Sequence, residues 1–315
     1  SNIRGDVLAY QQQDAAAAEA YKQALQELAS FSVSTMASAE ELASIRGRSL
    51  GGMAMLSLFA GDAAQAEELY RQVIGILLPA LGEAHPDSIW AMISWGSAAY
   101  ANQDLETARE AWERVLRTAE RVLGTGNTEV ATIKSNLGRL ELETGNYLVA
   151  ESLLADALRI DREHRAEDFD DLSFTLYNLA LALWALDQPA EATPLLQEAQ
   201  RIASNSGHRM LGPILLAQAE LACSAGPSES GIALAGEGLE QVQQHHGESD
   251  WRFDQALLVQ AYCRASLQSP VPDEVAHDAA CRLLQRWPND GWFHQQVLRL
   301  GAAIQPVANF EGCGA

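Results

Sequence analysis

The sequence predicts an all-α fold: a right-handed superhelical solenoid of stacked antiparallel helix pairs. Ala, Leu, Glu and Gln are abundant in the 315-residue chain, whereas Val, Ile and Thr are sparse, and this usage favours helices over strands. One alanine recurs four times at an interval of 42 residues, and a second small residue recurs in the same register. Self-similarity at such a period is typical of architectures in which each repeat stacks on the next.

The recurring small residues predict how the two helices of each pair meet. The alanines of the second helix, 42 residues apart, are Ala66, Ala108, Ala150 and Ala192. A bulky residue follows each of them four positions later: Tyr70, Trp112, Leu154 and Leu196. The first helix carries its own small position at Ala54, Gly96, Gly138 and Ala180. Because a small residue lets the facing helix approach while a large neighbour fills the adjoining space, we expect close packing at this point.

The repeat pattern also predicts the organisation of the whole chain. We expect a repeat array over residues 1–250, with about five to six helix pairs and a regular period from about 48 to 206. The phrases LGEAHPD and LGTGNTE join successive units, since Gly ends one helix and a turn residue begins the next. Residues 251–305 are expected to form a degenerate pair with a C-terminal capping helix, and residues 306–315 a flexible tail.

These residues resemble the tetratricopeptide repeat, whose pattern has a large residue followed by Gly or Ala in the first helix and an Ala in the second. The 42-residue length and the LGEAHPD phrase are similar to the kinesin light chain variant. The sequence departs from the pattern at Ala99 and Glu141, where an aromatic residue is expected. In bacteria, arrays of this variant resemble the docking or sensing portions of larger signalling proteins, including serine/threonine kinases.

The net charge of -21 excludes several classes of partner. Such a charge repels nucleic-acid phosphates and anionic membrane surfaces, so we expect neither as a partner. A basic or mixed-charge protein segment is the expected ligand. No stretch approaches the roughly 18 to 20 apolar residues that cross a bilayer, and the start lacks a signal-peptide pattern. We therefore expect a cytoplasmic piece of a longer protein, or a periplasmic one if that protein is membrane-anchored.

The candidate site is the concave groove that the first helices of such a superhelix line. The resemblance implies that Asn136 and Asn178 face this groove and hydrogen-bond a peptide backbone, for which an amide side chain is suited. The full predicted set is Trp90, Ser94, Ser97, Thr132, Ser135, Asn136, Arg139, Phe174, Tyr177 and Asn178. The alternatives are that the aromatic residues pack between repeats, that the asparagines bridge helices, and that Arg139 pairs with Glu143.

The sequence contains no recognisable catalytic motif, and we expect no cofactor and no metal. His245, His246 and Asp250 cluster near one predicted loop but are typical of a solvated turn. Three of the four cysteines lie in helical patterns, where Cys behaves as a small buried apolar residue. A disulfide between Cys263 and Cys281 remains an alternative, and Cys313 lies in the expected tail.

The leading functional hypothesis is a non-catalytic scaffold that binds a protein or peptide. Two other hypotheses remain open: a domain that senses a small ligand for an enzyme such as a serine/threonine kinase, and an array that associates with itself. Binding partners and oligomeric state distinguish the three.

Overall fold

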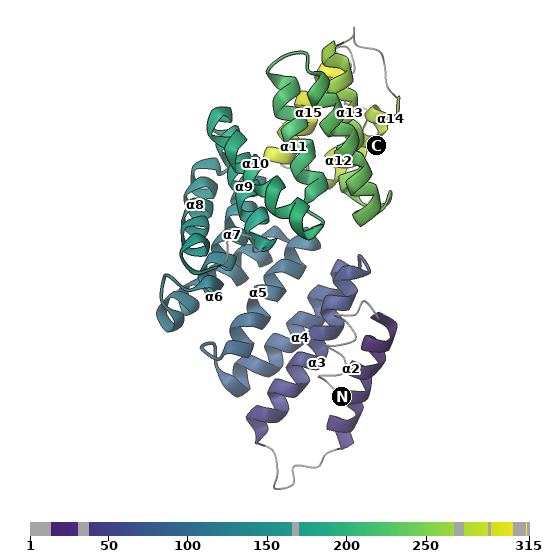
Figure 1. Cartoon of the computed structure of the whole chain (residues 1–315). Coiled ribbons are helices and arrows are strands. Elements are labelled where there is room, and N and C mark those ends of the chain that lie inside the picture. The colour runs from purple at the N-terminus through teal and green to yellow at the C-terminus, as the bar shows by residue number, and fades with distance from the viewer. Residues whose placement is uncertain are drawn as a thin grey trace. The chain divides into compact units, whose positions relative to one another are not determined.

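A computed structural model describes residues 14–30, 38–165, 170–267, 274–288 and 291–304, together with Cys313. Within these ranges every regular element is a helix (Figure 1), so the all-α prediction is confirmed. The helices are α2 (Asp14–Ser30), α3 (Ala39–Phe59), α4 (Ala63–Leu81), α5 (Pro86–Ala101), α6 (Leu105–Leu123), α7 (Thr128–Glu143), α8 (Tyr147–His164), α9 (Asp170–Ala185), α10 (Pro189–Ser206), α11 (Leu211–Ser224), α12 (Glu229–His246), α13 (Trp251–Leu267), α14 (Glu274–Arg286) and α15 (Trp292–Ile304). None of these described helices combines the length and the apolar character that crossing a bilayer requires.

The chain divides into two compact units, Ser1–Leu137 and Gly138–Ala315, which are called unit 1 and unit 2. The division falls within α7, so the array expected over residues 1–250 extends across both units. The expected tail, residues 306–315, lies outside the described residues except for Cys313.

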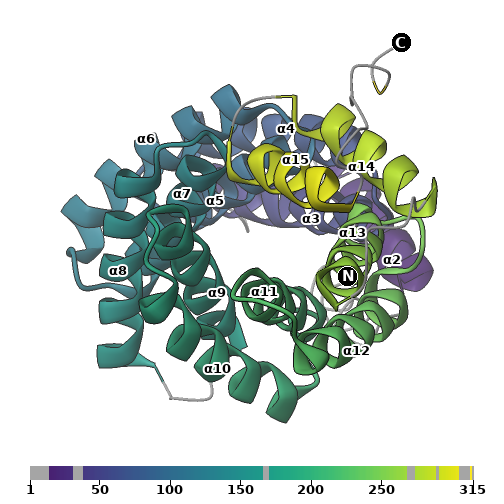
Figure 2. The same ribbon diagram turned by 90° about the horizontal axis from the view of Figure 1, so that it is seen from above.

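Antiparallel pairing and stacking recur within each unit. In unit 1, α3 packs against α4, α4 against α5 and α5 against α6, and the first helices α3 and α5 also contact each other. In unit 2 the same relation joins α11 to α13, while α14 and α15 both pack against α13 (Figure 2). The first helices of these successive pairs therefore lie side by side, as a solenoid of stacked pairs requires.

The predicted contact between small and large residues holds each pair together. A Cβ atom added to Gly96 of α5 would lie 2.5 Å from Nε1 of Trp112 on α6. The same indole nitrogen donates a hydrogen bond to the carbonyl oxygen of Ile93 over 3.0 Å. At the next repeat, a Cβ atom on Gly138 would lie 2.5 Å from Cγ of Leu154. Since these distances leave no room for a methyl group, glycine at the first-helix position permits the close approach of the second helix.

The turn within each pair needs one residue in the left-handed region. Four such residues recur at 42-residue spacing: Gly61 (φ +81°), Gln103 (φ +64°), Gly145 (φ +83°) and Asp187 (φ +62°). Glycine adopts this conformation without steric cost, whereas Gln103 and Asp187 adopt it under tertiary constraint. The next residue then begins the second helix; for example, the Asp62 carboxylate accepts a hydrogen bond from the backbone N–H of Gln65 over 3.0 Å.

Candidate functional site

Six of the predicted site residues lie in unit 1, on the first helices α5 and α7. They are Trp90, Ser94, Ser97, Thr132, Ser135 and Asn136. Trp90 is the most exposed of them at 42%, whereas Ser135 is 4% exposed. Ser135 lies about 100° around the helix from Asn136, which turns its side chain into the unit, so its expected exposure was wrong. The other five residues form a surface that is called the first-helix face of unit 1.

Trp90 packs on α3 and also faces solvent. A Cβ atom on Gly51 would lie 2.6 Å from ring carbon Cη2 of Trp90, so that glycine makes room for the indole. The Trp90 ring meets the ring of buried Tyr70 edge-on, with 6.1 Å between centroids. Burial raises the pKa of the Tyr70 phenol, and a hydrogen bond with Ser94 opposes that rise. A rigidly held, partly exposed indole is typical of the aromatic residues that contribute most to binding at protein interfaces.

Two other hydroxyl groups of this face bond to their own helices. Oγ of Ser97 donates to the carbonyl oxygen of Ile93 over 3.1 Å, and Oγ1 of Thr132 donates to that of Thr128 over 3.2 Å. A serine hydroxyl has two acceptor lone pairs, so Oγ of Ser97 can also accept a hydrogen bond from a ligand N–H.

The remaining four predicted residues lie in unit 2. The guanidinium carbon of Arg139 lies 5.4 Å from the ring centroid of Phe174, a cation–π contact that uses the arginine within the unit. Tyr177 is 7% exposed, and burial raises its pKa to about 12. Asn178 is 1% exposed, and its Nδ2 donates to the carbonyl oxygen of Phe174 over 2.9 Å.

The expectation that Tyr177 and Asn178 face an open groove was therefore wrong. Oδ1 of Asn178 is buried with no hydrogen-bond partner among the described residues, which is the situation of an amide enclosed by packing. The physical reason is packing within unit 2, because Tyr177 belongs to its apolar core and the Asn178 amide bonds to its own helix. The asparagines at 136 and 178 thus occupy equivalent repeat positions but different environments.

The described part of residues 287–304, which is called the C-terminal segment, contacts the first helices α7, α9 and α11 of unit 2 in addition to α13. Nε1 of Trp287 donates to Oε1 of Glu143, at the end of α7, over 2.6 Å. The ring of Trp292 lies 5.2 Å from the ring of Trp184, at the end of α9. The third contact is to Glu220 on α11. The sequence predicted a cap on the open end of the array, whereas α15 reaches back across earlier repeats.

Glu220 on α11 is a buried carboxyl group that the C-terminal segment contacts. Its side chain is 0% exposed, and it accepts hydrogen bonds from Nε2 of Gln296 and from the guanidinium group of Arg299. Nε2 of Gln255 in turn donates to Oε1 of Gln296 over 3.2 Å. Desolvation raises the pKa of Glu220 to about 7 and outweighs the opposing effect of Arg299. The guanidinium of Arg299 also lies 4.9 Å from the Trp184 ring.

Sequence reasoning missed Glu220, although one signal was present. The helix α11, LGPILLAQAELACS, contains a single charged residue among apolar ones. A carboxylate in such a run has to find a partner or remain protonated. Its partners, Gln296 and Arg299, lie 76 and 79 positions further along the chain, so the repeat period does not predict them.

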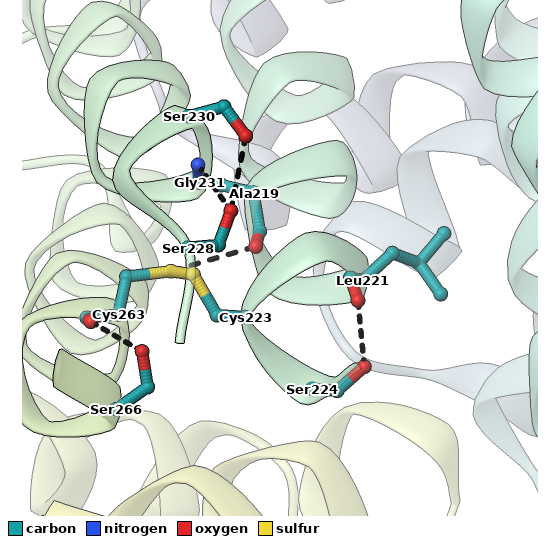
Figure 3. Close-up of a disulfide and its surroundings, with 9 residues drawn as sticks. All are labelled: Ala219, Leu221, Cys223, Ser224, Ser228, Ser230, Gly231, Cys263 and Ser266. Carbon is teal, nitrogen blue, oxygen red and sulfur yellow. Dashed lines mark hydrogen bonds between the residues drawn. A yellow bond between two sulfur atoms is a disulfide. The ribbon is translucent and has the colours of Figure 1, made fainter. Parts of the chain in front are cut away.

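All four cysteines are paired in disulfides. Cys223 at the end of α11 bonds to Cys263 on α13 (Figure 3), and Cys281 on α14 bonds to Cys313. Sγ of Cys263 also lies 3.4 Å from the carbonyl oxygen of Ala219. The alternative of a Cys263–Cys281 bond was therefore wrong, and so was the interpretation of three cysteines as apolar filling. Cys223 and Cys263 are 40 residues apart, close to one repeat, so adjacent first helices bring them together.

The described residues contain one group with the composition of a metal site. Nitrogen or sulfur atoms of His277, Cys281 and Cys313 all lie within 4.8 Å of one another. The two sulfur atoms are bonded to each other, and a disulfide does not supply the thiolates that bind metals. In the cluster of His245, His246 and Asp250 that the sequence suggested, the aspartate carboxylate accepts two hydrogen bonds of 3.0 Å from Arg252.

Comparisons with known proteins agree with this architecture. The tetratricopeptide repeat model matches residues 87–163. No curated protein matches the chain. The apo form of RapI is similar over 96% of this chain and 97% of that chain, with 12% identity and a TM-score of 0.66. The expected repeat and fold are thereby confirmed.

Two further solved structures share the fold. The Rap conjugation gene regulator of plasmid pLS20, in complex with the Phr* peptide, is similar over 96% of this chain and 74% of that chain, with 16% identity and a TM-score of 0.59. A crystal structure of nearly identical TPR-like repeats from Podosopora anserina, described as those of a kinesin light chain, covers 64% of this chain and 96% of that chain, with 22% identity and a TM-score of 0.53.

The buried Glu220 predicts a pH-dependent stability. Its pKa of about 7 lies above the ordinary value of 4.5, so the folded state holds the proton more tightly than the unfolded state. This contribution to stability is present below about pH 4.5 and is lost as the pH rises to about 7. Relative to Glu220→Gln, the natural chain should lose on the order of 3 kcal/mol of unfolding free energy across that range. Denaturant unfolding of both chains at several pH values checks this, and parallel pH profiles would contradict it.

Proposed function

The chain carries tetratricopeptide repeats, and we propose that it is a non-catalytic scaffold that binds a protein or peptide segment on the first-helix face of unit 1. In this proposal it serves as the docking or sensing region of a larger bacterial signalling protein. The observation that carries the proposal is Trp90, which is 42% exposed while its ring is held against Gly51 and Tyr70.

The arrangement around Trp90 suits an extended segment. Asn136 occupies the repeat position that corresponds to Ser94, and its amide can both donate to and accept from a peptide backbone. The likeness to the Rap regulator that was solved with the Phr* peptide supports peptide binding as the function of such a fold. The aromatic anchor would supply affinity, and the polar side chains would orient the segment.

The expected partner is basic or of mixed charge. The chain carries 42 acidic and 21 basic residues, so its field attracts cationic segments and repels nucleic acid. Such a field contributes more to the association rate and to the choice of partner than to raw affinity.

Two alternatives lead to different observations. A domain that senses a small ligand for an enzyme would bind a low-molecular-weight compound and select no peptide. A self-associating array would form oligomers whose population rises with concentration in light scattering.

We predict that Trp90→Ala weakens the binding of peptides selected from a random display library by about tenfold or more, equivalent to about 1.4 kcal/mol. Asn136→Ala should weaken binding by a smaller factor because a backbone hydrogen bond contributes about 1 kcal/mol. Fluorescence anisotropy with the selected peptides measures both effects. Val122→Ala is a matched control, since Val122 is 45% exposed but lies on the second helix α6. Equal binding by the Trp90 and Val122 variants would reject the proposed surface.

We also propose that the chain works in an oxidising compartment, in place of the cytoplasm that composition favoured. The supporting observation is that the four cysteines form two disulfides, Cys223–Cys263 and Cys281–Cys313. Structural disulfides persist where the environment is oxidising and are rare in the cytosol. This favours the periplasmic alternative that the sequence left open.

Thiol counting tests the compartment. Chain isolated from its natural host without reductant and denatured in an alkylating reagent should show no free thiol, and all four cysteines should react after reduction. Four reactive thiols before reduction would contradict the proposal.

A further inference from the structure

The C-terminal segment contacts Glu143 on α7, Trp184 on α9 and Glu220 on α11, and these three residues are called the first-helix face of unit 2. The segment's contacts are specific and polar as well as apolar: Trp287 donates to Glu143, while Gln296 and Arg299 donate to Glu220. On the first-helix face of unit 1, by contrast, Trp90 is 42% exposed.

We infer that the first-helix face of unit 2 is a helix-binding surface that recognises a basic, aromatic amphipathic helix, and that α15 is its resident occupant in this structure. The inference rests on the proposed scaffold function and adds to it a second surface with a defined class of partner.

Glu220 is the strongest support, because both groups that hydrogen-bond its carboxylate come from α15. A carboxylate is a costly choice for a surface that only needs to be filled, since an apolar residue of similar size would pack there without desolvating a charge. A buried carboxylate instead discriminates between occupants, because it accepts one that supplies donors and penalises one that does not.

The geometry of α15 defines what the surface recognises. Trp292, Gln296 and Arg299 follow one another at intervals of four and three residues, so they lie along one side of the helix. Trp184 contacts two of them, with its ring 5.2 Å from the Trp292 ring and 4.9 Å from the Arg299 guanidinium. A partner helix therefore needs an aromatic residue, an amide and a guanidinium in this order and spacing.

The adjoining side of α15 is apolar and packs inside unit 2, where α15 contacts α13 and α14. Phe293, Val297, Leu300 and Ile304 are all buried. The combination of an apolar stripe with one row of polar donors is the pattern by which amphipathic helices bind grooves.

The Cys281–Cys313 disulfide keeps α15 near the surface. Cys313 follows α15 in the chain and is bonded to α14, and its carbonyl oxygen accepts a hydrogen bond of 2.9 Å from Nε2 of Gln285. A covalent tie at both ends of the segment gives α15 a high effective concentration at the surface. An external helix of the same chemistry therefore competes poorly while the disulfide is closed.

A competition experiment on the full-length chain tests the inference. The probe is a fluorescent synthetic peptide with the sequence of residues 287–304, and its binding is measured by anisotropy. The natural chain should bind it weakly, because the surface is occupied. Gln296→Ala combined with Arg299→Ala loosens the resident helix and should increase affinity for the probe at least tenfold. Adding Glu220→Gln should remove that gain, since the amide carries no negative charge for the probe's guanidinium and has only one oxygen that accepts, whereas the carboxylate accepts on both.

Controls separate the possible outcomes. Arg201→Ala changes an exposed arginine on α10 and should leave probe binding as in the natural chain. If the double variant unfolds, Cys281→Ser with Cys313→Ser loosens the segment without altering the surface and should produce the same gain. No gain in a folded variant, or a gain that survives Glu220→Gln, would overturn the inference. This probe does not involve Trp90. The proposed function of unit 1 is therefore tested independently, by peptide binding to the Trp90→Ala variant.

Discussion

The fold depends on one contact, a large side chain of the second helix seated on a small residue of the first. Trp112 rests on Gly96 and Leu154 rests on Gly138, each at a distance that excludes even a methyl group on the glycine. The contact brings the two helix axes close enough for each to bury its apolar side, which neither could do alone. Repetition of the contact at 42-residue spacing stacks the pairs.

This constraint also explains why we propose that the binding surfaces lie on the first helices. The side of a first helix that carries the glycine is used by its own pair, and neighbouring first helices use the flanks. One side of each first helix remains for other contacts, and its surroundings differ between the two units. In unit 1 it presents Trp90 to solvent, whereas in unit 2 it supports the C-terminal segment through Glu143, Trp184 and Glu220.

The sequence predicted the structural features that recur with the 42-residue period. The helix pairs, the glycine positions and the turns follow from residues that recur every 42 positions, because each repeat creates the same local environment. The burial of Asn178 could not be predicted in this way, since Asn136 stands at the equivalent repeat position and is only partly buried. The Cys223–Cys263 disulfide could have been predicted from the period, because its separation of 40 residues nearly matches one repeat.

A double-mutant cycle between Gly138 and Leu154 tests the central contact most directly. Leu154 is 0% exposed, so Leu154→Ala should cost about 2 to 5 kcal/mol through the cavity it leaves. Gly138→Ala should cost about 1 to 3 kcal/mol because its methyl group meets the leucine. Gly75→Ala is the control, since no atom lies within 4 Å of an added Cβ there and the change should stabilise α4 by about 0.5 to 1 kcal/mol.

The cycle is measured by denaturant unfolding of the two single variants and the combined variant. The account predicts that the added methyl group enters the space vacated by Leu154, so that the combined variant is more stable than the sum of the single effects by about 1 kcal/mol or more. Additive effects, or a Gly138→Ala variant as stable as Gly75→Ala, would contradict it.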